Sequence, residues 1–416
     1  MEDLYYAFNP WWENKKFECG IQRTDYLGKI EKIFSRKQID IIIGSRRVGK
    51  TTIIKQLIKW CLHKNIPAKD IIYLSLDNPR LSKTTITEHL KLFRKIFMHS
   101  RSKKLYLFLD EIQETPGWEI ELKSMYDLEN VKIICSGSTS SLIKRQEGRL
   151  AGRQIVTVIY PLNFKEYLSF KKELPSKSED YKFEALFEEY LMRGGYPENA
   201  LHPSDDYLNN LIDDILVRDI VRLHSIKRIS VLKDLLMLIA SSVGSRTSFN
   251  KLGNILGIAV DTVKEYIGYL EASFLIKPLE KWATSYNERV YSQKKNYLFD
   301  SGIKTVLTGK GDLGVKVENA VFLCLFKKQP RIGYFAESEK EIDFVFSNFH
   351  VLGAVEVKYQ SEINLKDKKF DGLRLFLKRF PKNKKISVIS KDNERMLKEA
   401  GQMIEVIPAW KYLLKE

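Results

Sequence analysis

Residues 39–57 read IDIIIGSRRVGKTTIIKQL, and this stretch decides the fold class. Residues 39–43 are mostly β-branched and predict a buried parallel strand, whereas the apolar residues after Thr51 recur at helical spacing. Between them lies GSRRVGKT, residues 44–51, a full match to the phosphate-loop pattern in the strand–loop–helix context that the pattern requires. We therefore expect an α/β domain with a parallel sheet and a nucleotide site.

The residue types of this loop suit the binding of phosphate. Glycines let the backbone turn so that successive N–H groups point at phosphate oxygens, and the helix adds its positive end. Lys50 supplies a mobile cation for the β and γ phosphates, and the Thr51 hydroxyl can ligate Mg²⁺. ATP and Mg²⁺ are thus the expected cofactors. The predicted nucleotide-binding residues are Gly44, Ser45, Arg46, Arg47, Val48, Gly49, Lys50, Thr51 and Thr52.

A second motif follows at residues 105–111, LYLFLDE, an apolar strand pattern that ends in two acids. The buried strand would deliver Asp110 to the Mg²⁺ shell beside the phosphate loop. Glu111 points elsewhere and can orient or deprotonate the attacking water. An acid pair after a strand is a weak signal alone, but beside a phosphate loop it indicates a hydrolase, with Lys50 and Glu111 as catalytic residues.

Polar residues end the next predicted strand, residues 131–135, where a side chain can sense the γ-phosphate. Ser136 and Ser138 are the candidates, and an ordinary Ser/Gly loop with helix-capping roles is the alternative. Arg149 or Arg153, just before a fifth strand pattern, could reach the phosphate of a neighbouring subunit as an arginine finger. That interpretation implies a homo-oligomer formed through the ATPase core; a surface salt bridge is the alternative for either arginine.

Composition limits the possible classes of protein. A chain of 416 residues predicts two to four domains, and 44% hydrophobic residues can build a sizeable core. Four scattered cysteines without a CxxC pair suggest a reducing cytosol and no zinc site. No apolar run approaches the ~20 residues that span a bilayer, and the N-terminal sequence lacks a signal-peptide layout. We therefore expect a cytoplasmic protein without a membrane partner.

The net charge of +16, from 69 Lys and Arg against 53 Asp and Glu, favours a polyanionic partner. Duplex or branched DNA is the leading candidate, and a Lys-rich solvated surface is the alternative. The predicted domains are an N-terminal docking segment at 1–24, a P-loop ATPase core at 25–160, a helical lid at 161–229, a winged helix at 230–283 and a nuclease-like α/β domain at 284–416.

Residues 231–276 show the spacing of a helix-turn-helix followed by the start of a wing. The expected reading helix, residues 260–272, carries Lys264 against Glu265 and Glu271, so it is not strongly basic. Contact with DNA and a packing role both remain open for this segment.

The last predicted domain contains a second set of chemical residues. Glu318 lies early in a helix pattern, Asp343 lies on a strand, and Glu356 and Lys358 share one face of the next strand. This order is typical of restriction-endonuclease-like nucleases. Asp343 and Glu356 would hold Mg²⁺ with Glu318 supplementing them, and Lys358 would polarise the water or the phosphate. An inactive nuclease-like domain that binds protein is the alternative.

Segments along nearly the whole chain resemble the prokaryotic AAA-type ATPases that carry a C-terminal domain of unknown function. They are GSRRVGKTT (44–52), LFLDEIQ (107–113), CSGSTSS (135–141), RLAGR (149–153), YLMRGGYPE (190–198), LVRDI (216–220) and NYLFDSGI (296–303). The resemblance implies a P-loop ATPase. Our hypothesis is ATP hydrolysis coupled to DNA binding or processing, such as repair, recombination, mobile-element handling or defence; the alternative is a nucleotide-dependent signalling or scaffold protein.

Overall fold

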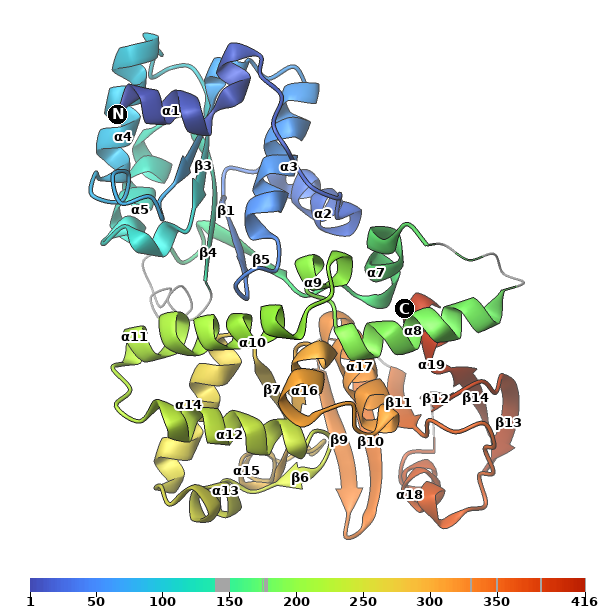
Figure 1. The fold of residues 1–416 in the computed structure, drawn as a ribbon. Helices are drawn as coiled ribbons and strands as arrows, with labels where there is room; N and C mark the ends of the chain where they lie inside the picture. Colours follow the sequence, from blue (N-terminus) through green and yellow to red (C-terminus); the bar gives the residue numbers. More distant parts are fainter. Residues whose placement is uncertain are drawn as a thin grey trace. The chain divides into compact units, whose positions relative to one another are not determined.

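The computed structural model describes residues 1–138, 150–173, 175, 179–329, 331–348, 351–381 and 384–415 (Figure 1). The chain divides into two compact units, Met1–Tyr160 and Pro161–Glu416. None of the helices in these ranges is long and apolar enough to cross a membrane.

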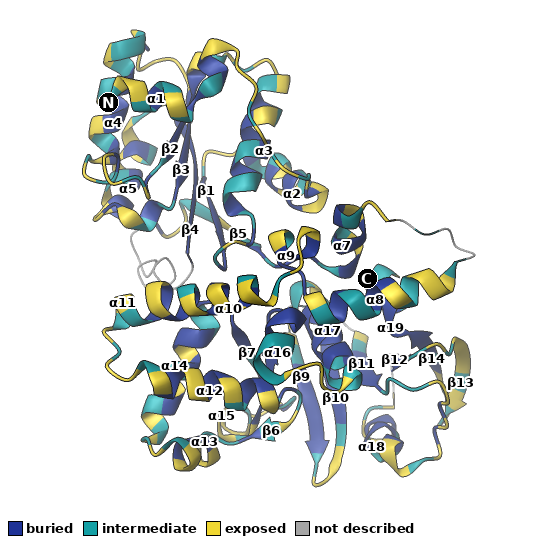
Figure 2. Cartoon of the chain, in the orientation of Figure 1, coloured by how far each residue is buried: buried dark blue, intermediate teal, exposed yellow. Residues whose placement is uncertain are grey.

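The first unit is built on a five-stranded parallel sheet with the order β2-β3-β4-β1-β5. Its strands are β1 (Ile39–Gly44), β2 (Ile71–Ser75), β3 (Leu105–Asp110), β4 (Val131–Ser138) and β5 (Gln154–Ile159). Its helices are α1 (Glu2–Phe8), α2 (Thr24–Phe34), α3 (Lys50–His63), α4 (Ile86–Phe97) and α5 (Trp118–Leu128). All residues of β1 are buried, as expected for a parallel strand covered on both faces (Figure 2). The α/β class with a parallel P-loop sheet is confirmed.

The N-terminal segment covers the free edge of β2. The Asn9 amide accepts a hydrogen bond from the backbone N–H of Tyr73 at 2.6 Å and donates one to the Tyr73 carbonyl at 3.0 Å. Trp12 Nε1 donates to the Ile71 carbonyl at 2.8 Å. Trp11 and Trp12 are only 4% and 7% exposed, so these two tryptophans are part of the core of the first unit.

The second unit contains a six-stranded sheet with the order β13-β14-β12-β11-β10-β9 and a three-stranded sheet with the order β6-β8-β7. The first comprises β9 (Arg331–Glu337), β10 (Lys340–Asn348), β11 (Val351–Val357), β12 (Lys384–Ser390), β13 (Arg395–Glu399) and β14 (Gln402–Pro408). The second comprises β6 (Arg246–Thr247), β7 (Ile276–Leu279) and β8 (Lys294–Leu298). Antiparallel pairing joins β9, β10 and β11, whereas β12 runs parallel to both β11 and β14.

Helices form the rest of this unit, including the residues predicted as a lid. They are α7 (Phe164–Lys171), α8 (Asp180–Arg193), α9 (Pro197–Leu201), α10 (Asp205–Asp214), α11 (Arg222–His224), α12 (Ile229–Ser241), α13 (Phe249–Leu256), α14 (Val260–Ala272), α15 (Tyr286–Tyr291), α16 (Ser301–Thr308), α17 (Leu313–Lys328), α18 (Asp371–Arg379) and α19 (Ala409–Lys415). A π-helical turn, Ile215–Val221, joins α10 to α11. Because α8 packs on α16 and α17, the predicted lid residues are part of the same compact unit as the C-terminal sheet.

Asp300 joins two of the sequence motifs in this unit. Its carboxylate accepts hydrogen bonds from the backbone N–H of Gly195 at 2.6 Å and of Ile303 at 3.1 Å, the second of which caps α16. A Cβ on Gly194 would lie 2.1 Å from Asp300 Oδ1, so a side chain at that position would collide with the carboxylate. The Asp300 carboxylate thus links the motif at 190–198 to the motif at 296–303 by hydrogen bonds.

Candidate functional site

The phosphate loop begins where β1 ends and closes where α3 begins. A Cβ on Gly44 would lie 2.4 Å from the Ile159 carbonyl oxygen, so only glycine fits between β1 and the end of β5. Gly49 has φ +100°, a backbone conformation that favours glycine. Lys50 Nζ donates to the carbonyls of Gly44 at 3.1 Å and Ser45 at 3.0 Å, so the lysine lies along the loop.

Asp110 lies at the centre of the site, at the carboxyl end of β3. Thr51 Oγ1 donates to Asp110 Oδ2 at 2.6 Å, Tyr73 Oη donates to the same oxygen at 2.9 Å, and Ser136 Oγ donates to Oδ1. The carboxyl ends of β1, β3 and β4 meet at one edge because the strands are parallel and adjacent, which is where α/β proteins bind ligands. Strand order therefore brings the predicted Thr51, Asp110 and Ser136 together.

Glu111 directly follows this carboxylate with φ +52°, an uncommon value for a residue other than glycine. Its backbone N–H donates to Ser136 Oγ at 3.4 Å, and Gln113 Nε2 donates to Glu111 Oε2 at 2.5 Å. Uncommon backbone angles often occur at functional sites. The two acids thus have different partners, because Glu111 contacts Gln113 whereas Asp110 contacts hydroxyl groups.

The donor set fits the expected cofactors. Thr51 Oγ1 and Asp110 Oδ2 are hard oxygen ligands of the kind that Mg²⁺ prefers. The N-terminus of α3 and the Lys50 ammonium provide the positive charge that a phosphate chain requires. Loop and acids thus suit a nucleoside triphosphate with a divalent cation.

Three further positions were predicted from the sequence: Arg149, Arg153 and Ser138. Arg153 makes an ion pair with Asp127, with Nε 3.2 Å from Oδ1, and lies over the Tyr126 ring. Arg149 lies outside the described residues. Ser138 is buried at the end of β4, where it pairs in register with Gly44.

Two residues with contacts in this region, Tyr73 and Arg23, were not predicted from the sequence. Tyr73 contacts Asp110 from β2, where it lies in a continuous apolar strand run that gave no sign of a polar role. Arg23 donates to the carbonyls of Val48 at 3.3 Å and Tyr160 at 2.9 Å, which ties the phosphate loop to the end of the first unit. Arg23 belongs to none of the sequence motifs, so no sequence pattern indicated these contacts.

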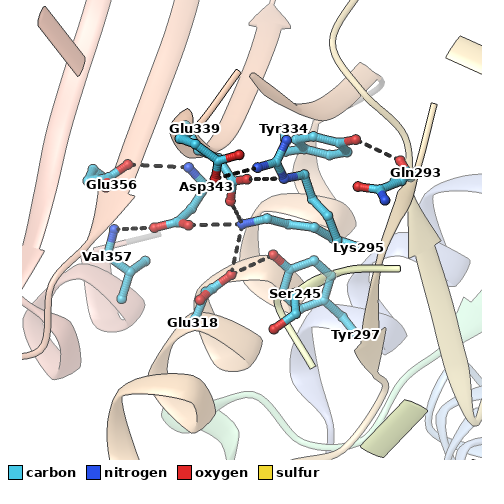
Figure 3. Close-up of polar contacts among 12 residues, drawn as sticks. Ser245, Gln293, Lys295, Tyr297, Glu318, Tyr334, Glu339, Asp343, Glu356 and Val357 are labelled. Atoms are coloured by element: carbon cyan, nitrogen blue, oxygen red, sulfur yellow. Dashed lines mark hydrogen bonds and ion pairs between the residues drawn. The ribbon is translucent and has the colours of Figure 1, made fainter. Parts of the chain in front are cut away.

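The acids predicted for the C-terminal domain do come together (Figure 3). Asp343 on β10 accepts a hydrogen bond from the backbone N–H of Val357 at 2.9 Å, and its own N–H donates to Glu356 Oε2 at 3.3 Å. Lys358 Nζ lies 2.6 Å from Glu356 Oε1 and 3.9 Å from Asp343 Oδ2. Glu318 approaches from α17.

A residue that the sequence analysis did not consider lies among these acids. Lys295, on β8 of the three-stranded sheet, places Nζ 3.0 Å from Asp343 Oδ1, 3.4 Å from Glu318 Oε1 and 2.5 Å from Glu341 Oε1. Its side chain is 1% exposed. Within the ranges that the structure describes, no three His, Cys, Asp or Glu side chains are arranged so that they could hold a metal ion.

The electrostatics of this cluster follow from burial and from the two lysines. Burial, with Asp343 nearby, raises the pKa of Glu318 to about 7 and the pKa of Glu356 to about 8. Burial would also raise the pKa of Asp343, but the ammonium groups of Lys295 and Lys358 outweigh it and hold that pKa below its usual value. Asp343 is therefore the carboxylate whose charge the lysines stabilise.

Family models match three successive parts of the chain. Residues 36–168 match an AAA domain. Residues 184–314 and 313–412 match two domains of unknown function, DUF8612 and DUF4143. The first unit therefore carries a P-loop AAA fold.

Relatives similar to this chain occur in a bacterium and an archaeon. An uncharacterized protein of Haemophilus influenzae is 25% identical, over 82% of this chain and 87% of its own length. An uncharacterized protein of Methanocaldococcus jannaschii is 28% identical, over 91% of this chain and 88% of its own length. The similarity to each relative thus spans most of both chains.

Solved structures resemble parts of the chain at low similarity. Closed Hsp104 with ATPγS and FITC casein has a TM-score of 0.32 and 15% identity, over 56% of this chain and 48% of that chain. AMPPCP-bound DnaA from Aquifex aeolicus has a TM-score of 0.28 and 19% identity, over 64% of this chain and 92% of that chain.

Proposed function

We propose that the first unit of this chain binds ATP with Mg²⁺ and hydrolyses it. One observation carries the proposal: the Thr51 hydroxyl of the phosphate loop donates to Asp110, and Glu111 follows that carboxylate in the chain. A metal-shell acid and a second acid aimed elsewhere, both beside a phosphate loop, are the parts that phosphoryl transfer to water requires.

Each residue then has a distinct task. The loop N–H groups and Lys50 grip and neutralise the phosphates, while Thr51 and Asp110 would hold Mg²⁺. Mg²⁺, when bound, would supply positive charge that offsets the negative charge developing on the phosphates. Glu111, held by Gln113, would orient the attacking water and accept its proton. Ser136 links the two acids, because it donates to Asp110 and accepts from the Glu111 backbone.

A neighbouring subunit completes the site in this proposal. The Arg153–Asp127 pair is 33% and 39% exposed, and exposed ion pairs contribute only about 0–1 kcal/mol. A phosphate on an adjacent copy can therefore compete for the arginine at small cost. This supports a homo-oligomer formed through the ATPase core.

We further propose that the second unit binds DNA, duplex or branched. Its elements α12, β6, α13, α14, β7 and β8 follow the order of a winged helix, with β8 paired to both β6 and β7. The exposed positions of α14 include Asp261 and Glu265 beside Lys264, so the helix surface is not basic.

The segment between β7 and β8 offers a better contact surface. It carries α15, where Tyr286 and Tyr291 are 69% and 87% exposed, together with Lys281 and Arg289. Exposed aromatic side chains interleaved with basic ones suit the phosphates and the unpaired, unstacked bases that branched DNA exposes. We assign the DNA contact to this segment rather than to α14.

The test is the ATPase rate of the full chain with single-stranded, duplex, branched and no DNA. We expect Glu111→Gln to lower kcat by about 10²–10⁴-fold, the contribution of a positioned base. Glu114→Gln, on an exposed side chain of the same segment, is the matched control and should leave the rate unchanged. Full activity in Glu111→Gln would refute the catalytic assignment.

The assays with DNA test the proposed DNA binding separately from ATP hydrolysis. Stimulation by any DNA form supports coupling. If no form altered the rate or bound at moderate salt, DNA binding would fail while the ATPase proposal stood.

The second candidate is a nucleotide-dependent signalling or scaffold protein whose C-terminal domain binds protein. The pairing of Lys295 with the C-terminal acids favours it, and for that reason DNA cleavage is left out of the proposed function. Metal-dependent nicking of DNA that is lost in Asp343→Ala would exclude this candidate.

A further inference from the structure

Lys295 reaches the acid cluster from a different sheet. It lies on β8 of the three-stranded sheet, whereas Asp343 lies on β10 of the six-stranded sheet and Glu318 lies on α17 (Figure 3). An ammonium group has three N–H donors, and Lys295 Nζ has three carboxylate neighbours, from Glu318, Glu341 and Asp343. The cation is therefore fully partnered by acids.

The other oxygens of Asp343, Glu356 and Glu341 also have partners. Asp343 Oδ2 accepts a hydrogen bond from the backbone N–H of Val357. One oxygen of Glu356 pairs with the Lys358 ammonium, and the other accepts a hydrogen bond from the backbone N–H of Asp343. The second oxygen of Glu341 pairs with Arg246 Nε at 3.0 Å. Tyr297 Oη donates to Glu318 Oε1 at 2.7 Å.

A divalent cation and this ammonium group cannot share the same oxygens. Mg²⁺ requires oxygen ligands at about 2.0–2.1 Å in near-octahedral geometry, with most of its shell free for water or substrate. A lysine ammonium donates hydrogen bonds to the same carboxylates at about 2.7–2.9 Å and fills the space between them. The residues around Asp343 therefore do not fit Mg²⁺ while Lys295 lies there.

We infer that Lys295 is a built-in cation that stands in the place of a divalent metal between Glu318 and Asp343. The nuclease-like domain is accordingly not a metal-dependent nuclease. Its acids instead fasten β8, and with it the three-stranded sheet, to α17 and the six-stranded sheet. This inference does not rest on ATP hydrolysis or on DNA binding.

Burial indicates that the lysine is a fixed part of the cluster. The Lys295 side chain is 1% exposed, and the Tyr334 ring lies 6.0 Å from Nζ. A displaced ammonium would leave three acids facing one another, and like charges at such distances repel strongly. The structure thus binds the lysine more firmly than a surface lysine that could swing away.

The test is Mn²⁺ binding to the full chain without nucleotide, measured by calorimetry and by the electron paramagnetic resonance of free Mn²⁺. We expect Asp343→Asn to leave the number of Mn²⁺ ions bound per wild-type chain unchanged. Lys295→Met, which keeps most of the unbranched side chain but removes its charge, should bind one Mn²⁺ more than wild type. Adding Asp343→Asn to that variant should remove the extra ion.

The matched control is Lys294→Met. Lys294 is the preceding residue of the same strand and lies near Glu280, outside the cluster, so its loss should create no site. Loss of a bound Mn²⁺ from the wild-type chain on Asp343→Asn would overturn the inference, as would a folded Lys295→Met variant that gains none. If Lys295→Met does not fold, the wild-type and Asp343→Asn titrations still decide whether the cluster holds a metal.

Discussion

Asp110 in the first unit and Asp343 in the second are both buried aspartates at the centre of a polar cluster, but they have opposite kinds of partner. The described contacts of Asp110 are hydroxyl groups, from Thr51, Tyr73 and Ser136. Asp343 faces the ammonium groups of Lys295 and Lys358. Hydroxyl groups orient a carboxylate and leave its charge available to a cation from solution, whereas ammonium groups neutralise it. The groups that contact a buried aspartate therefore indicate its role better than the presence of the aspartate alone.

The largest expected effect concerns the stability of the second cluster. Lys295→Met should lower the free energy of unfolding by about 3–5 kcal/mol, because it leaves buried carboxylates without their cation. Lys294→Met should cost less, since its partner Glu280 is 48% exposed. Denaturant unfolding of the full chain measures both. Equal losses in the two variants would contradict the special position of Lys295.

A pH dependence should follow at Asp300, whose carboxylate is held by neutral N–H donors. Burial raises its pKa from 3.8 to about 6, against the opposing hydrogen bonds of Gly195 and Ile303. The folded chain then binds an extra proton between these values, so stability is fully present below pH 3.8 and declines as the pH rises through about 6. The loss is up to about 3 kcal/mol at 1.36 kcal/mol per unit.

Asp300→Asn should flatten this slope, which unfolding curves between pH 4 and pH 7 can measure. The variant should also be less stable at each pH, because an amide cannot serve both N–H donors as a carboxylate does. An unchanged slope would show that another group carries the dependence. For Asp343 the sign is opposite, since its lowered pKa stabilises the fold above the unfolded value and loses that effect in acid.

The smallest of the three effects compares the two aspartates directly. Asp110→Asn should reduce Mg²⁺-dependent ATP turnover on the order of 10–100-fold, as does the loss of a group that supports a metal shell. Asp343→Asn should leave the turnover per folded chain unchanged. Steady-state ATPase assays at saturating Mg²⁺ make this comparison. Reduced turnover in both variants would mean that the second cluster also serves catalysis.

Local patterns were enough to predict that Thr51, Asp110 and Ser136 lie together, but they were not enough for the second cluster. The phosphate loop and the strand that ends in Asp110 are contiguous signals, and parallel strand order does the rest. Period-two alternation placed Glu356 and Lys358 on one face, and the structure has them 2.6 Å apart. Lys295 could not be found in this way, because it lies 48 residues before Asp343 and in another sheet. A run such as Gln293-Lys294-Lys295-Asn296 also reads as solvated surface, although Lys295 is buried.

The contacts of Asn9 and Trp12 with β2 can form early during synthesis of the chain. An uncovered edge strand is a template on which another chain can pair and aggregate. The covering segment precedes β2 in sequence, so on the ribosome it has already emerged when β2 appears. The outer edge of this sheet can therefore be closed by its own chain as soon as it folds.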